Sequence, residues 1–154
     1  MPPTQNDAPA WLLPAIILGF PIVFGTLWTV ICIVLSAVGG WGRLAQRYAA
    51  QQPSTIGQQF SSQSGRVGVV NYNRILKICT SPAGLYLDVF IFFRPGHKPL
   101  LIPWSEIHNG SVALSFFVEY VAVDVGSPEI ARLRLPKKIF AGQPVLIDGQ
   151  SVPA

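Results

Sequence analysis

The hydrophobic pattern of the chain begins with one long run that holds no charged side chain. Charged residues are absent from Ala8 to Gly42, and residues 11–38 are almost continuously apolar. A helix of about 20 residues crosses the hydrocarbon core of a bilayer, so this run is long enough to span it with some tilt. We therefore predict a transmembrane helix over 11–38, preceded by a short extracytoplasmic tail of residues 1–10.

A secretory signal peptide would also place an apolar run near the N-terminus. Such a peptide has a cationic first region and an apolar stretch of roughly 7–15 residues before its cleavage site. In this chain Asp7 is the one charged side chain ahead of the run, and the run is much longer than that stretch. The pattern therefore favours a helix that is retained.

The segment just after the span has the pattern of a short amphipathic helix. Its apolar residues recur at helical spacing: Trp41, Leu44, Ala45 and Tyr48. Arg43 and Arg47 lie on the other side of this helix. Because Trp and Tyr favour the headgroup level of a membrane, we predict that Trp41 and Tyr48 are interfacial anchors. In the alternative interpretation, the helix packs on its own domain.

A polar stretch with one proline and two glycines follows and is typical of a linker. We assign residues 39–64 to the juxtamembrane helix and this linker. From Arg66 onward the pattern is that of β-strands, bounded by Gly, Pro and Asn turns. Six strands are predicted, over 66–72, 74–80, 84–93, 99–103, 111–125 and 129–135. They form an antiparallel meander, curled or closed around one core, in a β domain of residues 65–142 with a tail at 143–154.

The strand over 84–93 is apolar on both faces. Leu85, Leu87 and Val89 share the face assigned to the core, and Tyr86, Phe90 and Phe92 share the other. If the second face is open, Tyr86, Phe90 and Phe92 form an exposed aromatic surface for a partner. If another element covers it, the same residues form a second core.

Charge enters the picture through its distribution. The chain holds 11 Lys and Arg against 7 Asp and Glu. After the span, no acidic residue appears before Asp88. The charged residues between the span and Asp88 are all basic: Arg43, Arg47, Arg66, Arg74 and Lys77. The positive-inside rule therefore predicts a cytoplasmic β domain and an outer N-terminus, in the cytoplasmic membrane.

The same five basic residues are the candidate lipid-headgroup site. A basic residue near an anionic leaflet contributes about 1 kcal/mol, so together they could hold the domain against the membrane. In the alternative they only set topology and keep the domain soluble. No nucleic-acid-binding motif accompanies them, so nucleic acid is not an expected partner.

The stretch "FFRPGHKPLLIPWSEI" collects groups that recur in active sites. Ser105, Glu106, His108 and His97 lie close together in sequence, but no nucleophile elbow is present and two isolated histidines make a poor metal site. A strand, a Pro95-Gly96 turn, a buried strand and a capped turn explain the stretch better. We expect no catalytic, cofactor or metal site, and no enzyme activity.

Several segments carry a family resemblance: "GWGRLAQRY", "VNYNRIL", "AGLYL" and "FFRPGHKPLLIPWSEI". They resemble a group of small bacterial single-span membrane proteins of unknown function, whose cytoplasmic part is similar to a pleckstrin-homology (PH) or GRAM domain. The resemblance implies a strongly bent β-sheet and no catalytic residues. "PKKIFAGQ" is too short for the long C-terminal helix that closes PH-like barrels. The segment 41–50, the membrane or a partner would then cover that opening.

These expectations lead to one function and one alternative. The leading hypothesis is a membrane-anchored, non-enzymatic binding or adaptor module whose β domain engages anionic lipid or a membrane-associated protein. The alternative is a small accessory subunit that contacts a membrane protein complex through its span.

Overall fold

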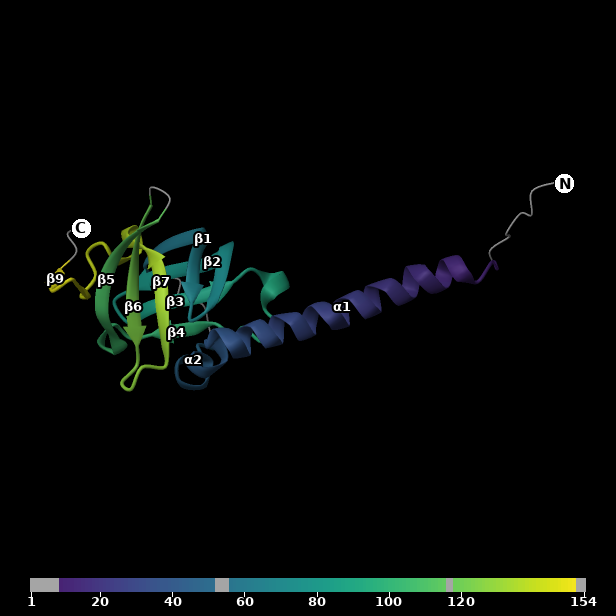
Figure 1. The fold of residues 1–154 in the computed structure, drawn as a ribbon, viewed down its shortest axis with the longest axis horizontal. Coiled ribbons are helices and arrows are strands. Elements are labelled where there is room, and N and C mark those ends of the chain that lie inside the picture. Colours follow the sequence, from purple (N-terminus) through teal and green to yellow (C-terminus); the bar gives the residue numbers. More distant parts are fainter. Residues whose placement is uncertain (1–8, 52–55, 116–117, 152–154) are drawn as a thin grey trace.

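The chain forms one long N-terminal helix followed by a curled β-sheet (Figure 1). The computed structural model describes residues 9–51, 56–115 and 118–151. Helix α1, Leu12–Gly39, has 28 residues and is therefore about 42 Å long. Pro14 lies in its first turn, where a missing N–H leaves no helical bond unmade. By length and composition α1 is able to cross a membrane.

Gly40 ends α1 and redirects the chain into α2, Trp41–Tyr48. Its φ of +82° is a left-handed conformation that favours glycine. The strands follow in chain order: β1 Gln58–Val67, β2 Val70–Ser81, β3 Gly84–Val89, β4 Leu100–Ile102, β5 Ile107–Ser115, β6 Val118–Val125, β7 Ala131–Pro136, β8 Leu146–Ile147 and β9 Gln150–Ser151. Three short 3-10 turns separate some of them: η1 Ile91–Phe93, η2 Trp104–Glu106 and η3 Lys137–Phe140.

The sheet order is β4-β3-β2-β1-β7-β6-β5-β8-β9. The first seven strands in this order are antiparallel and curl into a half-barrel, which confirms the predicted fold class. β8 adds to β5 in parallel through Gly110 and Ile147, and β9 pairs with β8. The tail expected at 143–154 is therefore bound to the sheet as far as the structure describes it.

Several of the strand predictions need correction. β1 begins at Gln58, so the second half of the expected linker is a strand. The run 66–72 contains the β1–β2 turn, because Gly68 adopts a φ of +55°. The run 111–125 is two strands, β5 and β6, and the residues between them, 116–117, lie outside the described part of the chain.

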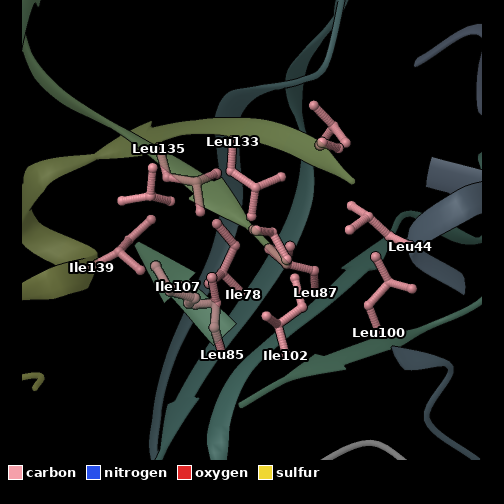
Figure 2. Packing of buried hydrophobic residues seen from close by; sticks show 14 of the residues in the cluster. Leu44, Ile78, Leu85, Leu87, Leu100, Ile102, Ile107, Leu133, Leu135 and Ile139 are labelled. Atoms are coloured by element: carbon pink, nitrogen blue, oxygen red, sulfur yellow. The ribbon is translucent and has the colours of Figure 1, made fainter. Parts of the chain in front are cut away.

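The core fills the inside of the half-barrel, and α2 closes one of its openings. Figure 2 shows Leu44 entering this core from α2 beside Leu100 of β4. Trp41 is fully buried, and its Nε1 donates a 2.8 Å hydrogen bond to the carbonyl oxygen of Lys98. Tyr48 is also buried and donates to Glu106 Oε2 at 2.8 Å.

This burial corrects the prediction that Trp41 and Tyr48 are interfacial anchors. Their side chains are packed in the domain core, with Trp41 fully buried and Tyr48 7% exposed, which leaves little surface for headgroups. The amphipathic pattern was therefore that of a core-facing helix, which is the alternative interpretation. At the other opening, η3 contributes the buried residues Ile139 and Phe140 in place of a long C-terminal helix.

Candidate membrane-facing site

The second half of α1 is docked on the β domain along one stripe. The residues with reduced exposure in this half lie on one helical face: Trp28, Cys32, Ser36 and Gly39. Trp28 Nε1 donates to the carbonyl oxygen of Phe92 at 2.8 Å, and its ring lies 5.3 Å from that of Phe93. Ser36 Oγ donates to the carbonyl oxygen of Gly96 at 2.5 Å. The helix and the loop between β3 and β4 are therefore joined at several points.

Two glycines of the β domain permit this close approach. A Cβ at Gly68 would overlap the carbonyl oxygen of Gly39, and a Cβ at Gly96 would lie 2.9 Å from Ile33 Cα. Both glycines have positive φ, +55° and +76°. Backbone therefore packs against backbone where α1 meets the domain.

The chain between β3 and β4 forms an exposed loop beside α1, seen in Figure 1 as the short teal turn that extends beyond the sheet. We call Phe90, Ile91, Phe92 and Phe93 the aromatic loop. Its outer side chains are open: Phe90 is 43% exposed, Ile91 62% and Phe92 68%. The turn is held by hydrogen bonds from Phe93 N to Phe90 O and from Arg94 N to Ile91 O. The backbone hydrogen bonds therefore hold these apolar side chains in exposed positions.

Basic side chains flank the aromatic loop. Lys77 Nζ lies 5.7 Å from the centroid of the Phe90 ring. Arg94 forms a 2.8 Å ion pair with Asp88, a carboxylate that also accepts the backbone N–H of Val89. The hydrogen bond from Arg94 to Asp88, followed by the negative charge of Asp88, raises the pKa of Arg94. Together they fix the guanidinium at the base of the loop.

The five basic residues predicted as a headgroup site do not form one patch. Lys77 adjoins the aromatic loop, and Arg74 is exposed on the same strand at a φ of +58°. Arg43 and Arg47 are exposed on α2, where Arg47 lies 3.5 Å from Glu106. Arg66 is exposed on β1, directly opposite Arg134 of β7.

The aromatic surface predicted from Tyr86, Phe90 and Phe92 is reduced to its last two members. Tyr86 is 5% exposed, because it lies within β3, where every residue is buried. Burial, followed by the charge of Asp88, raises the pKa of Tyr86. The strand ends at Val89, so Phe90 and Phe92 belong to the loop that follows and no longer alternate with the core.

The polar groups of the 97–108 stretch lie in different environments. His97 is 3% exposed, and its Nε2 is 2.9 Å from the hydroxyl of Tyr72. His97 ends the predicted Pro95-Gly96 turn, where its N–H donates to the carbonyl oxygen of Arg94, but its side chain is buried, whereas His108 is exposed. Glu106 accepts hydrogen bonds from Arg47 and Tyr48 of α2, and Ser105 is exposed.

Trp28, Cys32, Ser36 and Arg94 were not predicted as functional residues. Arg94 directly precedes the predicted Pro95-Gly96 turn, and its ion pair with Asp88 spans six residues along the chain. The stripe on α1 left a signal in the sequence, since polar or small residues at positions 32, 36 and 39 recur on one face of an otherwise bulky helix. Its partner, the β3–β4 loop, is about 60 residues away in sequence, as the Ser36–Gly96 hydrogen bond shows.

Comparisons of the chain with protein-family models, with curated proteins and with solved structures found no match.

Proposed function

We propose that this protein is a single-pass membrane protein whose β domain is held flat against the cytoplasmic leaflet, where the aromatic loop and its basic neighbours bind anionic lipid. The observation that carries the proposal is the place of the aromatic loop: three exposed large apolar side chains lie beside the helix that is able to cross the membrane. In this role the protein is a non-enzymatic binding or adaptor module.

The length of α1 supports this placement. A hydrocarbon core of about 30 Å takes about 20 residues of helix, whereas α1 has 28. If the core begins near Leu12, it ends near Ile31. Trp28 then lies just inside the cytoplasmic border, and the hydrogen bond from Trp28 brings Phe92 to the same depth.

The chemistry of the loop suits that depth. Aromatic side chains are enriched at membrane interfaces, and basic side chains there contribute about 1 kcal/mol each on an anionic leaflet. Phe90, Ile91 and Phe92 would enter the acyl border, while Lys77 and Arg74 would meet phosphates. Exposed apolar side chains that cluster on a protein surface are typical of a membrane or partner contact, and their exposure to water would be unfavourable.

The resemblance to bacterial single-span proteins with PH or GRAM-like domains supports this proposal. A strongly bent sheet that presents one loop to a membrane suits such a module. A domain of this type does not identify its ligand by fold, so the proposal rests on the loop itself.

The depth of the aromatic loop can be measured in the full-length protein. We would place a nitroxide label on a cysteine at position 92 (Phe92→Cys) in nanodiscs that contain anionic lipid. The matched control is Leu114→Cys, an equally open apolar position, 73% exposed, on the β5–β6 hairpin. Cys32 and Cys79 are buried in the native protein.

We expect the label at position 92 to be accessible to oxygen dissolved in the acyl region and protected from a water-soluble nickel relaxer. The label at 114 should show the opposite ratio. Lys77→Gln should bring the label at 92 closer to water. If both labels are equally accessible to water, the lipid-binding proposal is wrong and a protein partner for the loop becomes the better explanation.

A further inference from the structure

A second cluster of basic side chains lies on the outer face of the half-barrel. Pairing across four strands places residues from β1, β7, β6 and β5 in one row: Arg66, Arg134, Ala122 and Ser111. Directly paired residues of antiparallel strands share a face, and the neighbours Val67 and Leu133 face the core. Arg66 and Arg134 therefore point outward together.

This arrangement is unfavourable for folding alone. Like charges directly opposite on paired strands repel each other. Neither Arg66 nor Arg134 has an ion-pair partner among the residues that the structure describes. Arg132, two positions along β7, adds a third guanidinium, which lies 3.1 Å from Asp124. The cluster thus contains three positive charges, on Arg66, Arg132 and Arg134, beside one negative charge, on Asp124.

The three arginines line a hollow in the surface. Its volume is about 300 Å³, and its floor is made by the small side chains of Ser111, Ala113 and Ala122. Bulky residues at these positions would fill the space between the guanidinium groups. The hollow is therefore a recess with cationic walls and a hydroxyl in its lining.

We propose that this hollow binds the phosphate group of a phosphomonoester or phosphodiester. A guanidinium presents N–H donors in a fork that matches two oxygens of a phosphate. Bound phosphate would offset the repulsion between Arg66 and Arg134. The recess is large enough to hold a phosphate with part of the group attached to it.

The ligand has two possible sources with the same chemistry, a lipid headgroup or a soluble phosphate ester. Gly68, which also lines the hollow, packs on the carbonyl oxygen of Gly39 at the end of α1. The hollow therefore lies close to the point where the helix enters the domain. The site does not depend on the aromatic loop, which is on the β3–β4 connection.

Binding can be measured with the full-length protein in micelles of a maltoside detergent, which carries no phosphate. Glycerol phosphate would be titrated at low salt and followed by calorimetry. We expect saturable binding that Arg134→Gln and Arg66→Gln each weaken at least ten-fold. The matched control is Arg43→Gln, which removes the same charge from an exposed site on α2 outside the hollow; we expect it to change the affinity less than two-fold.

A stability measurement separates binding from a structural role. Without ligand, Arg66→Gln should leave the unfolding temperature of the β domain unchanged or raise it, because a repulsion is removed. The rise in that temperature on adding glycerol phosphate should be lost. A lower unfolding temperature without ligand would instead mean that Arg66 stabilises the fold and would count against the proposal.

Nanodiscs that contain anionic phospholipid identify the source. If a lipid headgroup fills the hollow, glycerol phosphate should bind at least ten-fold more weakly in these discs than in the micelles, and this difference should disappear in Arg66→Gln. If the ligand is soluble, the affinity for glycerol phosphate should be the same in the discs and in the micelles. The proposal is overturned if binding is absent, or if the three variants behave alike.

Discussion

The two halves of α1 are both apolar but have different surroundings. From Leu12 to Leu27 nearly every side chain is exposed, and neither Gly19 nor Gly25 has a neighbour within 4 Å of the position a Cβ would take. From Trp28 onward one face packs on the β domain through hydrogen bonds, ring contacts and backbone contacts. The first half is thus exposed along nearly all of its length, whereas the second is an internal interface of the protein.

The difference shows what makes an apolar helix dock on a domain. Bulky side chains are as common in the docked half as in the free half. What distinguishes the docked half is small or hydrogen-bonding residues at contact positions, matched by glycines in the β domain. Lipid offers no such matching groups, so the docked stripe is specific to the protein.

The sharpest way to break this interface is Gly68→Ala. A methyl group there would overlap the carbonyl oxygen of Gly39, and a φ of +55° is unfavourable for alanine. Overpacking and left-handed strain together should lower the free energy of unfolding of the β domain by about 3 kcal/mol. Chemical unfolding in detergent micelles, followed by near-UV circular dichroism, would measure the loss.

The matched control for this substitution is Gly19→Ala in the free half of the helix. Its Cβ would enter open space, and alanine is a better helix former than glycine by about 0.5–1 kcal/mol. The control should therefore not destabilise the β domain. Equal losses from Gly68→Ala and Gly19→Ala would show that the contrast between the two halves of α1 is wrong.

A smaller effect is expected from Ser36→Ala. The substitution removes the hydroxyl that donates to the carbonyl oxygen of Gly96 and leaves a partly buried acceptor without its donor. A loss of about 1–2 kcal/mol should follow in the same unfolding measurement. In contrast, Thr26→Ala should change stability little, because the Thr26 hydroxyl donates to the carbonyl oxygen of Ile22 within the exposed half of α1. The interpretation of the stripe fails if Ser36→Ala is neutral.

The sequence predicted most of the architecture, for local reasons. A charge-free run, a glycine break, a 3.6-residue repeat and alternating strands depend on near neighbours, so the long helix, α2 and the curled antiparallel sheet were found. The predicted Pro95-Gly96 turn is also confirmed, by a 2.8 Å hydrogen bond from His97 N to Arg94 O. Strand ends were less accurate, since polar β1 has no alternation that distinguishes it from a linker.

The site was predicted less well, because its parts meet only in three dimensions. The sequence predicts Phe92 as part of an aromatic surface, but its neighbour Trp28 is 64 positions away in sequence. The sequence predicts Arg66 as part of a headgroup site, but the residue opposite it, Arg134, lies on β7, far along the chain. Trp41 shows the converse error, since an amphipathic helix beside a span has the same pattern whether it faces headgroups or a core.

The smallest expected effect concerns pH and a buried group beside the docked stripe. His97 packs edge-on against the rings of Trp41 and Tyr72 and bonds to the Tyr72 hydroxyl. Burial lowers the pKa of His97 below its ordinary value near 6.5. Protons therefore bind more readily to the unfolded chain, so the free energy of unfolding should fall as the pH drops from about 6.5 toward the lowered pKa.

The measurement compares unfolding free energies at pH 7 and pH 5 in the native protein and in His97→Gln, which keeps a hydrogen-bonding side chain but does not titrate. The native protein should lose more stability across this interval than His97→Gln. His108→Gln removes the exposed histidine and should retain the native pH dependence. If His97→Gln and the native protein lose the same amount, His97 is not the titrating group and the prediction is wrong.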